Sequence, residues 1–227
     1  MIELDNVTVV YDNGVHGLRE FSLTINAGEF VFVTGPTGEG KTTLLRTIYR
    51  EVMPRQGTVK VAGRDITRLR DGQLTVLRRR LGVVFQDFRL LPDRTVEENL
   101  AFALAAAGSG SRQVGRRIAE LLSLVGLFEI RERFPAQLSA GEQQRVCIAR
   151  SLIHNPPIVL ADEPTGNLDP ETSWGIVEVF QRINAEQGST VVITSHDEAV
   201  VTRAQRRVCR IEGGRLVRDD QAAGYRA

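Results

Sequence analysis

A glycine-rich octapeptide near the start of the chain has the residue types and the spacing of a phosphate-binding loop. Residues 35–42 read GPTGEGKT and match the pattern G-x-x-x-x-G-K-[ST]. Glycines in such a loop let the backbone wrap a phosphate with its N–H groups turned inward. Lys41 can then reach the terminal phosphates, and the Thr42 hydroxyl can ligate Mg²⁺. The octapeptide predicts a nucleoside triphosphate site and leaves the reaction open; the alternative is a plain glycine-rich turn between a strand and a helix.

An Asp-Glu pair after an apolar run supplies the acidic groups that such a site needs. Residues 158–169 read IVLADEPTGNLD, and the run reads as a buried strand that ends in Asp162 and Glu163. At the carboxyl end of a strand, Asp162 is where a magnesium-ordering acid is expected. Glu163 is close enough to act on a water molecule aimed at the terminal phosphate. The alternative, an ordinary Asp-Glu turn before Pro164, is disfavoured by the glycine loop.

Three single residues fit the same site. Tyr11, in VVYDNG, is placed to stack on an adenine ring. Gln86 ends the strand-like run LGVVFQ, where its amide oxygen can contact Mg²⁺ or the attacking water, and His196 closes VVITSH, where a ring N–H can donate to the terminal phosphate. A half-buried strand tyrosine and a strand-end polar residue remain alternatives for Tyr11 and Gln86. His16 and His154 have no comparable placement.

A second anion site is indicated at residues 138–145, which read LSAGEQQR. A Ser-Ala-Gly corner there comes directly before an apolar helical pattern, and the first N–H groups of a helix attract anions. Either one of the two phosphate sites is idle, or a phosphate is held from both sides.

The elements that position these residues alternate along the chain. Short apolar or alternating runs bounded by turn residues predict strands, and from about residue 71 to 154 the pattern is mainly helical. This order predicts an α/β fold with an inserted helical lobe. Strands are expected at 2–11, 20–26, 29–35, 157–164 and 190–197, hairpins at 57–66 and 207–219, and helices at 41–52 and 114–127.

The bulk composition is that of a globular protein, with 42% hydrophobic and 25% charged residues. The formal net charge of +1 argues against a protein that coats nucleic acid. The longest apolar run, at 100–107, is far shorter than the about 20 residues of a membrane helix, and the N-terminus lacks the pattern of a signal peptide. Cys147 and Cys209 are expected to be small buried hydrophobes. We therefore expect a soluble chain without a transmembrane segment of its own.

Together these motifs resemble those of the ABC-type ATPases, and the resemblance covers essentially the whole chain. GPTGEGKT corresponds to the phosphate loop, Gln86 to the Q-loop, LSAGEQQR to the signature, LADEP to the Walker B segment with its glutamate, NLD (167–169) to the D-loop and His196 to the switch histidine. The resemblance implies ATP and Mg²⁺ as cofactors and ATP hydrolysis as the activity. It implies catalytic roles for Glu163, His196 and Gln86, metal contacts from Thr42, Gln86 and Asp162, and nucleotide contacts from Tyr11, Gly35, Pro36, Thr37, Gly38, Glu39, Gly40, Lys41, Thr42, Thr43, Ser139, Gly141, Glu142 and Asp169.

The resemblance also implies one domain over residues 1–227 and a two-chain site. Residues 1–86 and 155–227 would form a RecA-like P-loop core with an antiparallel β subdomain, and 87–154 a helical subdomain that carries the signature. In this family the signature of one subunit faces the ATP held by the other. A homodimer that forms on ATP binding is therefore expected, in which both phosphate sites are used.

Two residues depart from the family pattern. Ala140 stands where the signature usually has its first glycine, although Ser139 and Gly141 are retained. Glu39 stands at a position of the phosphate loop that is usually small or neutral, where a carboxylate repels a triphosphate unless its side chain turns to solvent. We expect slow rather than absent hydrolysis.

Longer stretches resemble the cell-division branch of the family most closely. They are 77–87, 84–99 and 161–169, and FRLLP after Gln86 and YDNGVHGL near the N-terminus favour the same branch. The relatives that drive lipoprotein release or macrolide efflux share GEQQR and PTGNLD, and they remain an alternative. The branch implies an integral membrane partner of the FtsX type and a location on the cytoplasmic face of the membrane.

Three other classes of protein are disfavoured. A nucleic-acid-linked ABC ATPase would need coiled-coil insertions or a basic surface, and the arginine cluster at 68–80 is better explained as a solvated helix face. A silent nucleotide-binding scaffold would have no need of Glu163 and His196. A small-molecule kinase or GTPase would leave LSAGEQQR unexplained.

The loop after Gln86 is apolar for its position. Phe88, Leu90 and Leu91 either receive a short helix from the membrane partner or fill the helical lobe's own core. In the first case Arg89 and Asp93 would form a polar rim.

Overall fold

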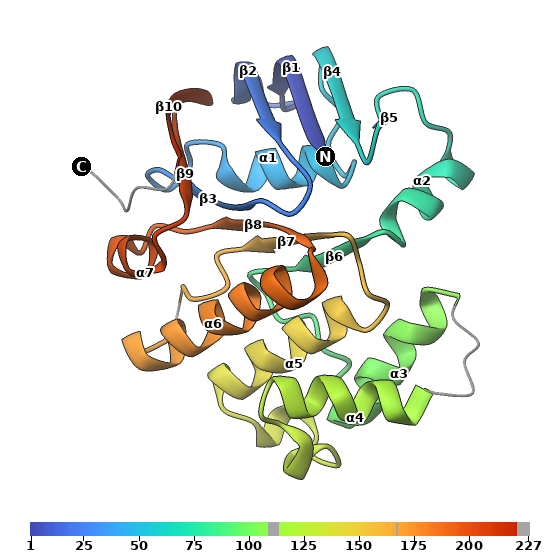
Figure 1. The fold of residues 1–227 in the computed structure, drawn as a ribbon. Helices are drawn as coiled ribbons and strands as arrows, with labels where there is room; N and C mark the ends of the chain where they lie inside the picture. The colour runs from blue at the N-terminus through green and yellow to red at the C-terminus, as the bar shows by residue number, and fades with distance from the viewer. Residues whose placement is uncertain (109–113, 167, 222–227) are drawn as a thin grey trace.

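Two β-sheets form the framework of the computed structural model, which describes residues 1–108, 114–166 and 168–221 (Figure 1). A four-stranded antiparallel sheet has the order β2-β1-β4-β5, and a six-stranded sheet has the order β10-β9-β3-β8-β7-β6. Strands β9, β3, β8, β7 and β6 are parallel to their neighbours, and β10 is antiparallel to β9. The strands are β1 Ile2–Val10, β2 His16–Ile25, β3 Phe30–Thr34, β4 Gln56–Val61, β5 Arg64–Asp65, β6 Leu81–Val84, β7 Ile158–Asp162, β8 Thr190–Thr194, β9 Arg207–Glu212 and β10 Arg215–Asp220.

The helices cover both faces of the six-stranded sheet (Figure 1). Those of the described residues are α1 Lys41–Ile48, α2 Asp71–Arg78, α3 Val96–Ala106, α4 Val114–Leu124, α5 Ala140–Leu152, α6 Pro170–Gln187 and α7 Glu198–Ala204, with 3₁₀ turns at Phe128–Ile130 and Pro135–Gln137. None of these helices is long and apolar enough to cross a membrane.

The six-stranded sheet separates two hydrophobic cores. Alternate residues of β3 point to opposite faces, so that Phe30 and Phe32 pack with α3–α6, whereas Val31 and Val33 pack with α1 and the antiparallel sheet. Burial on both faces explains why the strands of this sheet read as continuous apolar runs. As a consequence, α1 and α5 lie on opposite faces of one sheet.

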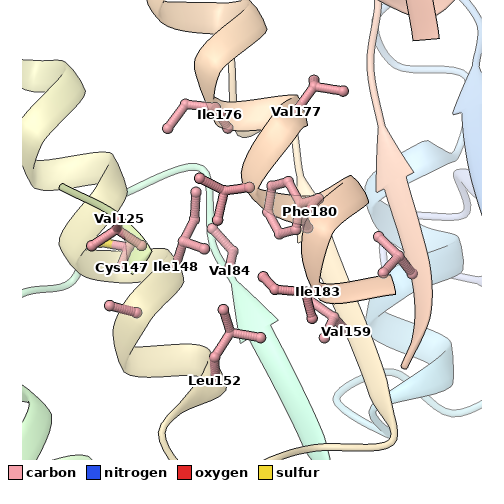
Figure 2. Packing of buried hydrophobic residues seen from close by; sticks show 14 of the residues in the cluster. Val84, Val125, Cys147, Ile148, Leu152, Val159, Ile176, Val177, Phe180 and Ile183 are labelled. Carbon is pink, nitrogen blue, oxygen red and sulfur yellow. The ribbon is translucent and has the colours of Figure 1, made fainter. Parts of the chain in front are cut away.

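The core beneath α5 and α6 holds the helical lobe against the sheet (Figure 2). Ile148 and Leu152 of α5 and Phe180 of α6 are fully buried and pack against Val159 of β7. Burial of each such side chain contributes about 1.5–3 kcal/mol. The signature helix is thus anchored along its length and not only at its ends.

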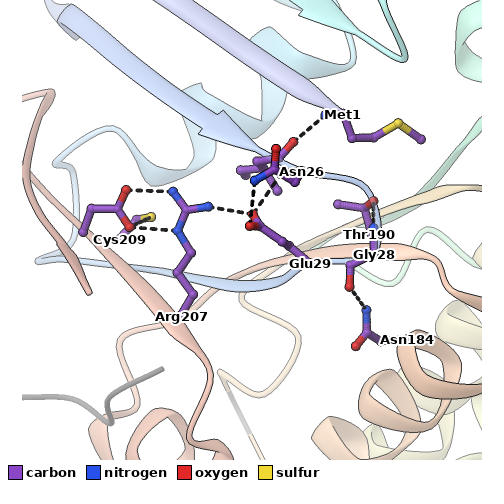
Figure 3. A network of polar contacts seen from close by, with 10 residues as sticks. Met1, Asn26, Gly28, Glu29, Asn184, Thr190, Arg207 and Cys209 are labelled. Carbon is purple, nitrogen blue, oxygen red and sulfur yellow. Dashed lines mark hydrogen bonds and ion pairs between the residues drawn. The ribbon is translucent and has the colours of Figure 1, made fainter. Parts of the chain in front are cut away.

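A network of charges fixes the β9–β10 hairpin to the start of β3 (Figure 3). Arg207, 9% exposed, donates two hydrogen bonds to Asp219, at 2.8 and 2.7 Å, and a third to Glu29 at 2.6 Å. The guanidinium holds the pKa of Asp219 below its usual range. Glu29 and Asp219 remain 24% and 32% exposed, so the value that applies to the loss of one partner is that of a hydrogen bond to a charged group, about 1.5–3 kcal/mol. The hairpin is therefore a firmly held element.

The fold class expected from the sequence is confirmed. Both expected hairpins form, and each turns on two residues with positive φ, which are Ala62 and Gly63 at 50° and 76°, and Gly213 and Gly214 at 55° and 75°. The expected helix at 114–127 runs as α4 to Leu124 and stops before Gly126, where φ is 73°.

One expected helix is shorter in the structure, and two helices were not expected. The helix expected at 41–52 ends at Ile48, because Arg50 is left-handed with φ of 60° and the N–H groups of Glu51 and Val52 both bond back to the Arg46 carbonyl. Helices α6 and α7 were not singled out from the sequence.

Candidate functional site

The phosphate loop connects β3 to α1 and depends on its glycines. Gly35, Gly38 and Gly40 have φ of 144°, 87° and 108°. A Cβ on Gly40 would lie 2.3 Å from the Gly17 carbonyl oxygen, and one on Gly35 would lie 2.2 Å from that of Ile211. The backbone is therefore packed too closely, and in too unusual a conformation, for any other residue at these two positions.

Lys41 lies inside the loop that precedes it. Its ammonium donates hydrogen bonds to the carbonyls of Gly35 at 2.7 Å and Pro36 at 2.9 Å, and the side chain is 4% exposed. A fixed positive charge at the N-terminus of α1 adds to the helix dipole, and both favour an anion. The loop fits a phosphate group, which is the fit that the sequence predicts.

Asp162 lies at the end of β7, against the first turn of α1. Its Oδ1 accepts hydrogen bonds from the hydroxyls of Thr42 at 3.1 Å and Thr194 at 2.7 Å. Mg²⁺ prefers hard oxygen ligands and usually takes only one or two carboxylates or hydroxyls from the protein, with phosphate and water oxygens completing the shell. The Thr42 and Asp162 oxygens fit that requirement.

Glu163 connects the phosphate loop to the end of β8. Its Oε1 lies 3.5 Å from the Lys41 ammonium, and its Oε2 lies 3.1 Å from Nδ1 of His196. The backbone is left-handed at φ of 46°, a strain of about 1–3 kcal/mol for a non-glycine residue, and the N–H of Glu163 is held by the Thr194 hydroxyl at 2.9 Å. The carboxylate is only 15% exposed and borders a hollow of about 190 Å³. A carboxylate so fixed can orient a water molecule and accept its proton.

Tyr11 lies in the turn after β1, beside the first turn of α1. Its hydroxyl and that of Thr43 share a hydrogen bond of 2.9 Å, and a Cβ on Gly17 would lie 2.9 Å from the tyrosine ring. The ring therefore borders the phosphate loop, and its stacking on adenine stays a prediction. Tyr11 is half-buried and directly follows β1, and its N–H donates to the Val15 carbonyl at 2.9 Å, so the alternative of a half-buried strand tyrosine also stays open.

Gln86 is exposed, two residues beyond the end of β6, and the chain after it is held by α5. The Phe88 carbonyl accepts hydrogen bonds from Arg150 at 2.8 Å and from the Cys147 thiol at 3.0 Å. The segment predicted to contact the terminal phosphate is thus attached directly to the signature helix.

The signature begins with a reciprocal cap on α5. The Ser139 hydroxyl accepts from the Glu142 N–H at 3.3 Å, and the Glu142 carboxylate accepts from the Ser139 N–H at 2.7 Å, which lowers the pKa of Glu142. A Cβ on Gly141 would lie 2.7 Å from the Thr172 methyl group, so α5 and α6 approach closely here.

Asp169 places the segment after Glu163 beside the signature. Its carboxylate caps α6 by accepting from the N–H groups of Glu171 and Thr172, at 3.1 and 3.0 Å, and hydrogen bonding at Thr172 lowers its pKa. Asn167, the first residue of the predicted D-loop, lies outside the described residues. A hollow of about 360 Å³ is lined by both segments, at Ser139, Ala140, Gly141, Glu142, Arg145, Leu168, Asp169 and Thr172.

Apart from Gln86, which is exposed after β6, the predicted residues fall into two groups in the structure. One group surrounds the phosphate loop and the ends of β7 and β8, and consists of Tyr11, Gly35 to Thr43, Asp162, Glu163 and His196. The other consists of Ser139, Gly141, Glu142 and Asp169. The two helix N-termini that the sequence marks as anion sites belong to helices on opposite faces of the six-stranded sheet.

One connecting residue was missed in the sequence. Thr194 bonds to both Asp162 and Glu163, and it closes the apolar run just before Ser195 and His196. The sequence shows only that Thr194 is a polar residue at the end of a predicted strand, and it does not show which residues Thr194 contacts. The sequence predicts that the Glu39 carboxylate repels a triphosphate unless its side chain turns away. In the structure this carboxylate accepts a hydrogen bond from the N–H of Gly213.

Known proteins are similar to this chain in sequence and in fold. The family profile of the ABC transporter matches residues 18–166. The cell division ATP-binding protein FtsE of Bacillus subtilis is 47% identical over 225 residues, which cover 99% of this chain and 98% of the relative. FtsE of Mycobacterium tuberculosis is 44% identical over 226 residues, with the same two coverages.

Solved structures agree with the sequences. The dimeric structure of MJ0796, a bacterial ABC transporter cassette, matches with a TM-score of 0.91 at 38% identity, over 99% of this chain and 100% of that one. A dimeric post-hydrolysis state of MJ0796 bound to ADP and Pi matches at 0.90 and 37%, with the same coverages. Because the profile and the relatives cover most of the chain, the chain belongs to the family of ABC transporter ATPases and hydrolyses ATP.

Proposed function

We propose that two copies of this chain close on ATP and Mg²⁺, and that the closure drives a conformational change in an FtsX-like integral membrane protein during bacterial cell division. In this proposal Lys41, Thr42 and Asp162 hold Mg·ATP, and Glu163, His196 and Gln86 act at the terminal phosphate. The remaining predicted contacts surround the nucleotide, with those of the signature coming from the second copy.

The placement of α1 and α5 supports a site made by two chains. Both helix N-termini have the features of an anion site, yet they cover opposite faces of one buried sheet. A second copy can present Ser139 and Gly141 to the phosphate loop of the first copy without unfolding the sheet. The dimeric state of the similar cassettes is consistent with this arrangement.

The attachment of the Gln86 segment to α5 supports transmission of nucleotide state to the helical lobe. Arg150 and Cys147 hold the Phe88 carbonyl, so a displacement at Gln86 is passed to the signature helix through two hydrogen bonds. Phe88, Cys147 and Arg150 all belong to the proposed helical subdomain 87–154, and this attachment begins two residues after Gln86, where the proposed segment 1–86 ends.

A groove next to the same segment is suited to a membrane partner. It encloses about 580 Å³, with an apolar floor that includes Val83, Phe85 and Ala103 and arginines around it. Phe88 and Leu90 pack partly against the lobe's own core, which favours the core alternative for those two side chains and moves the expected contact toward Phe85 and Arg89. The groove is lined by Thr75, Arg78, Arg79, Val83, Phe85, Arg89, Ala103, Ala106, Ala107, Arg150, Ser151 and His154.

The lining determines the kind of segment that fits. Four arginines face one groove, and their charges are complementary to a short amphipathic helix that carries carboxylates. The relatives that are named for cell division support a partner that acts in that process, and in this proposal the helix belongs to an FtsX-like protein. A lipoprotein-release or macrolide-efflux partner is the second candidate.

The experiment is recovery of the membrane protein with tagged chain from native membranes, compared for the wild type, Arg79→Glu and Arg116→Glu. Arg79 lines the groove, whereas Arg116 is an exposed arginine on α4 that pairs with Glu120 at 2.9 Å. FtsX should be recovered with the wild type and Arg116→Glu and lost from Arg79→Glu, while all three bind ATP equally in calorimetry. Equal recovery with Arg79→Glu refutes the groove, and recovery of a different transporter subunit refutes the cell-division role.

A further inference from the structure

The phosphate loop is joined to the β9–β10 turn through Glu39. The carboxylate of Glu39 accepts a hydrogen bond from the N–H of Gly213, and the Glu39 carbonyl accepts one from the N–H of Gly214 at 3.1 Å. Side chain and main chain of one loop residue therefore bond to two successive N–H groups of the same turn. Glu39 is also less exposed than the three loop residues before it.

The turn has the geometry to receive a carboxylate. Gly213 and Gly214 both have positive φ, and in this conformation the Gly213 N–H reaches the Glu39 carboxylate while the Gly214 N–H reaches the Glu39 carbonyl. Hydrogen bonds from N–H groups stabilise a carboxylate strongly. The negative charge of Glu39, which lies in the phosphate loop, is thus partly compensated by the N–H of Gly213 in the β9–β10 turn.

The turn is itself fixed on two sides. The Gly214 carbonyl accepts from the Arg19 N–H of β2 at 2.8 Å, and a Cβ on Gly214 would lie 3.1 Å from the Gly17 carbonyl oxygen. At the other end of the hairpin, Arg207 binds Asp219 and Glu29 (Figure 3). A bond from the loop to this turn is therefore a bond to a rigid element.

We propose that Glu39 is a positioning residue that holds the nucleotide-free phosphate loop in its phosphate-binding conformation by fastening it to the β9–β10 turn. The loop contains three glycines with positive φ, which lose much conformational entropy when they are ordered. A loop ordered before ATP arrives does not lose that entropy on binding. The proposal concerns ATP binding by a single chain and does not depend on the membrane partner.

Two substitutions at Glu39 separate the effect of its hydrogen bond to the turn from the effect of its negative charge. Glu39→Gln keeps an oxygen that can accept from Gly213 and removes the negative charge, whereas Glu39→Ala removes both. Glu212→Ala is the matched control, because it deletes a carboxylate of the same hairpin that pairs with Arg210 and not with the loop.

The first measurement is amide hydrogen exchange at residues 37–40 in the nucleotide-free protein, and the second is affinity for Mg·ATP by calorimetry. Glu39→Ala should exchange at least tenfold faster at the loop and bind ATP about ten- to a hundredfold more weakly, as the loss of one hydrogen bond to a charged group predicts. Glu212→Ala should stay within about twofold of the wild type in both measurements, and Glu39→Gln, which keeps a neutral acceptor, should fall between the wild type and Glu39→Ala.

Three results overturn the proposal. If Glu39→Ala and Glu39→Gln both bind ATP more tightly and exchange like the wild type, the carboxylate is only repulsive. If the two variants are weakened alike, charge matters and the retained acceptor does not. If affinity falls in Glu39→Ala without faster exchange at the loop, the residue acts on the nucleotide and not on the loop.

Discussion

Thr194→Val tests whether one hydroxyl positions both acidic groups of the site. The Thr194 hydroxyl, which is fully buried, donates to the Asp162 carboxylate at 2.7 Å and accepts from the Glu163 N–H at 2.9 Å. Valine has nearly the same shape, so the packing of β8 is preserved. A lost hydrogen bond to a charged group costs about 1.5–3 kcal/mol and an unpaired N–H about 1–3 kcal/mol, which together give a loss of about 2.5–6 kcal/mol in the free energy of unfolding.

Thr190→Val is the control for this experiment. Thr190 is equally buried in the same strand, and its hydroxyl accepts one hydrogen bond, from the Gly28 N–H at 3.0 Å, far from the acidic pair. We expect a loss of about 1–2 kcal/mol, measured by urea unfolding at an unchanged slope, and normal ATP hydrolysis. Thr194→Val should in addition lose hydrolysis at a temperature where it is fully folded. The reasoning is refuted if the two variants are equally stable and Thr194→Val hydrolyses ATP normally.

Three further predictions concern the acidic groups and the two-chain site. Glu163→Gln should bind ATP normally and hydrolyse it about 10²–10⁴-fold more slowly, and it should accumulate as a dimer in light scattering; near-normal turnover would show that the carboxylate takes no proton. Ser139→Arg should bind ATP as a monomer without dimerising, but mixed with Lys41→Ala it should form ATP-dependent heterodimers, since one composite site keeps an intact loop and signature; absence of any heterodimer counts against the two-chain site. The pKa of Asp219 is lowered by Arg207, so its contribution to stability is full above the ordinary carboxyl pKa of about 3.9 and disappears as the pH falls through the lower folded value. Asp219→Asn should therefore be less stable than the wild type at neutral pH and show a smaller further loss on acidification, and equal acid sensitivity of the two proteins would contradict the assignment.

Local patterns in the sequence were sufficient for the parts of the site that lie at the ends of strands. The glycine loop follows one apolar strand, and Asp162 and Glu163 end another, so their meeting at one edge follows from parallel pairing. The bond from Thr194 was not accessible in the same way, because it depends on the register that places Asp162 opposite Thr194. Strand patterns predict faces but not which residues stand opposite each other.

The other elements differ in how far local sequence determines them. Helix α6 is marked in the sequence by Asp169 and Pro170 at its start and by Gly188 at its end. The early end of α1 at a left-handed Arg50 was not readable, since arginine gives no indication of positive φ. The partner of Glu39 is far away in the sequence, and no local pattern identifies such a contact.

The strand order has a consequence for synthesis of the chain. Strand β3, which leads into the phosphate loop, has β8 and β9 as its neighbours, and the ion pair between Glu29 and Arg207 joins positions separated by 178 residues. At about 5–20 residues per second, the ribosome needs roughly 10–35 seconds to deliver these neighbours after β3 has emerged. During that interval FVFVT is an unpaired apolar strand, a segment of the kind that aggregates or is bound by chaperones. Messages truncated before β8 should therefore yield insoluble chains without a nucleotide site, and the supply of ATP cannot rescue them.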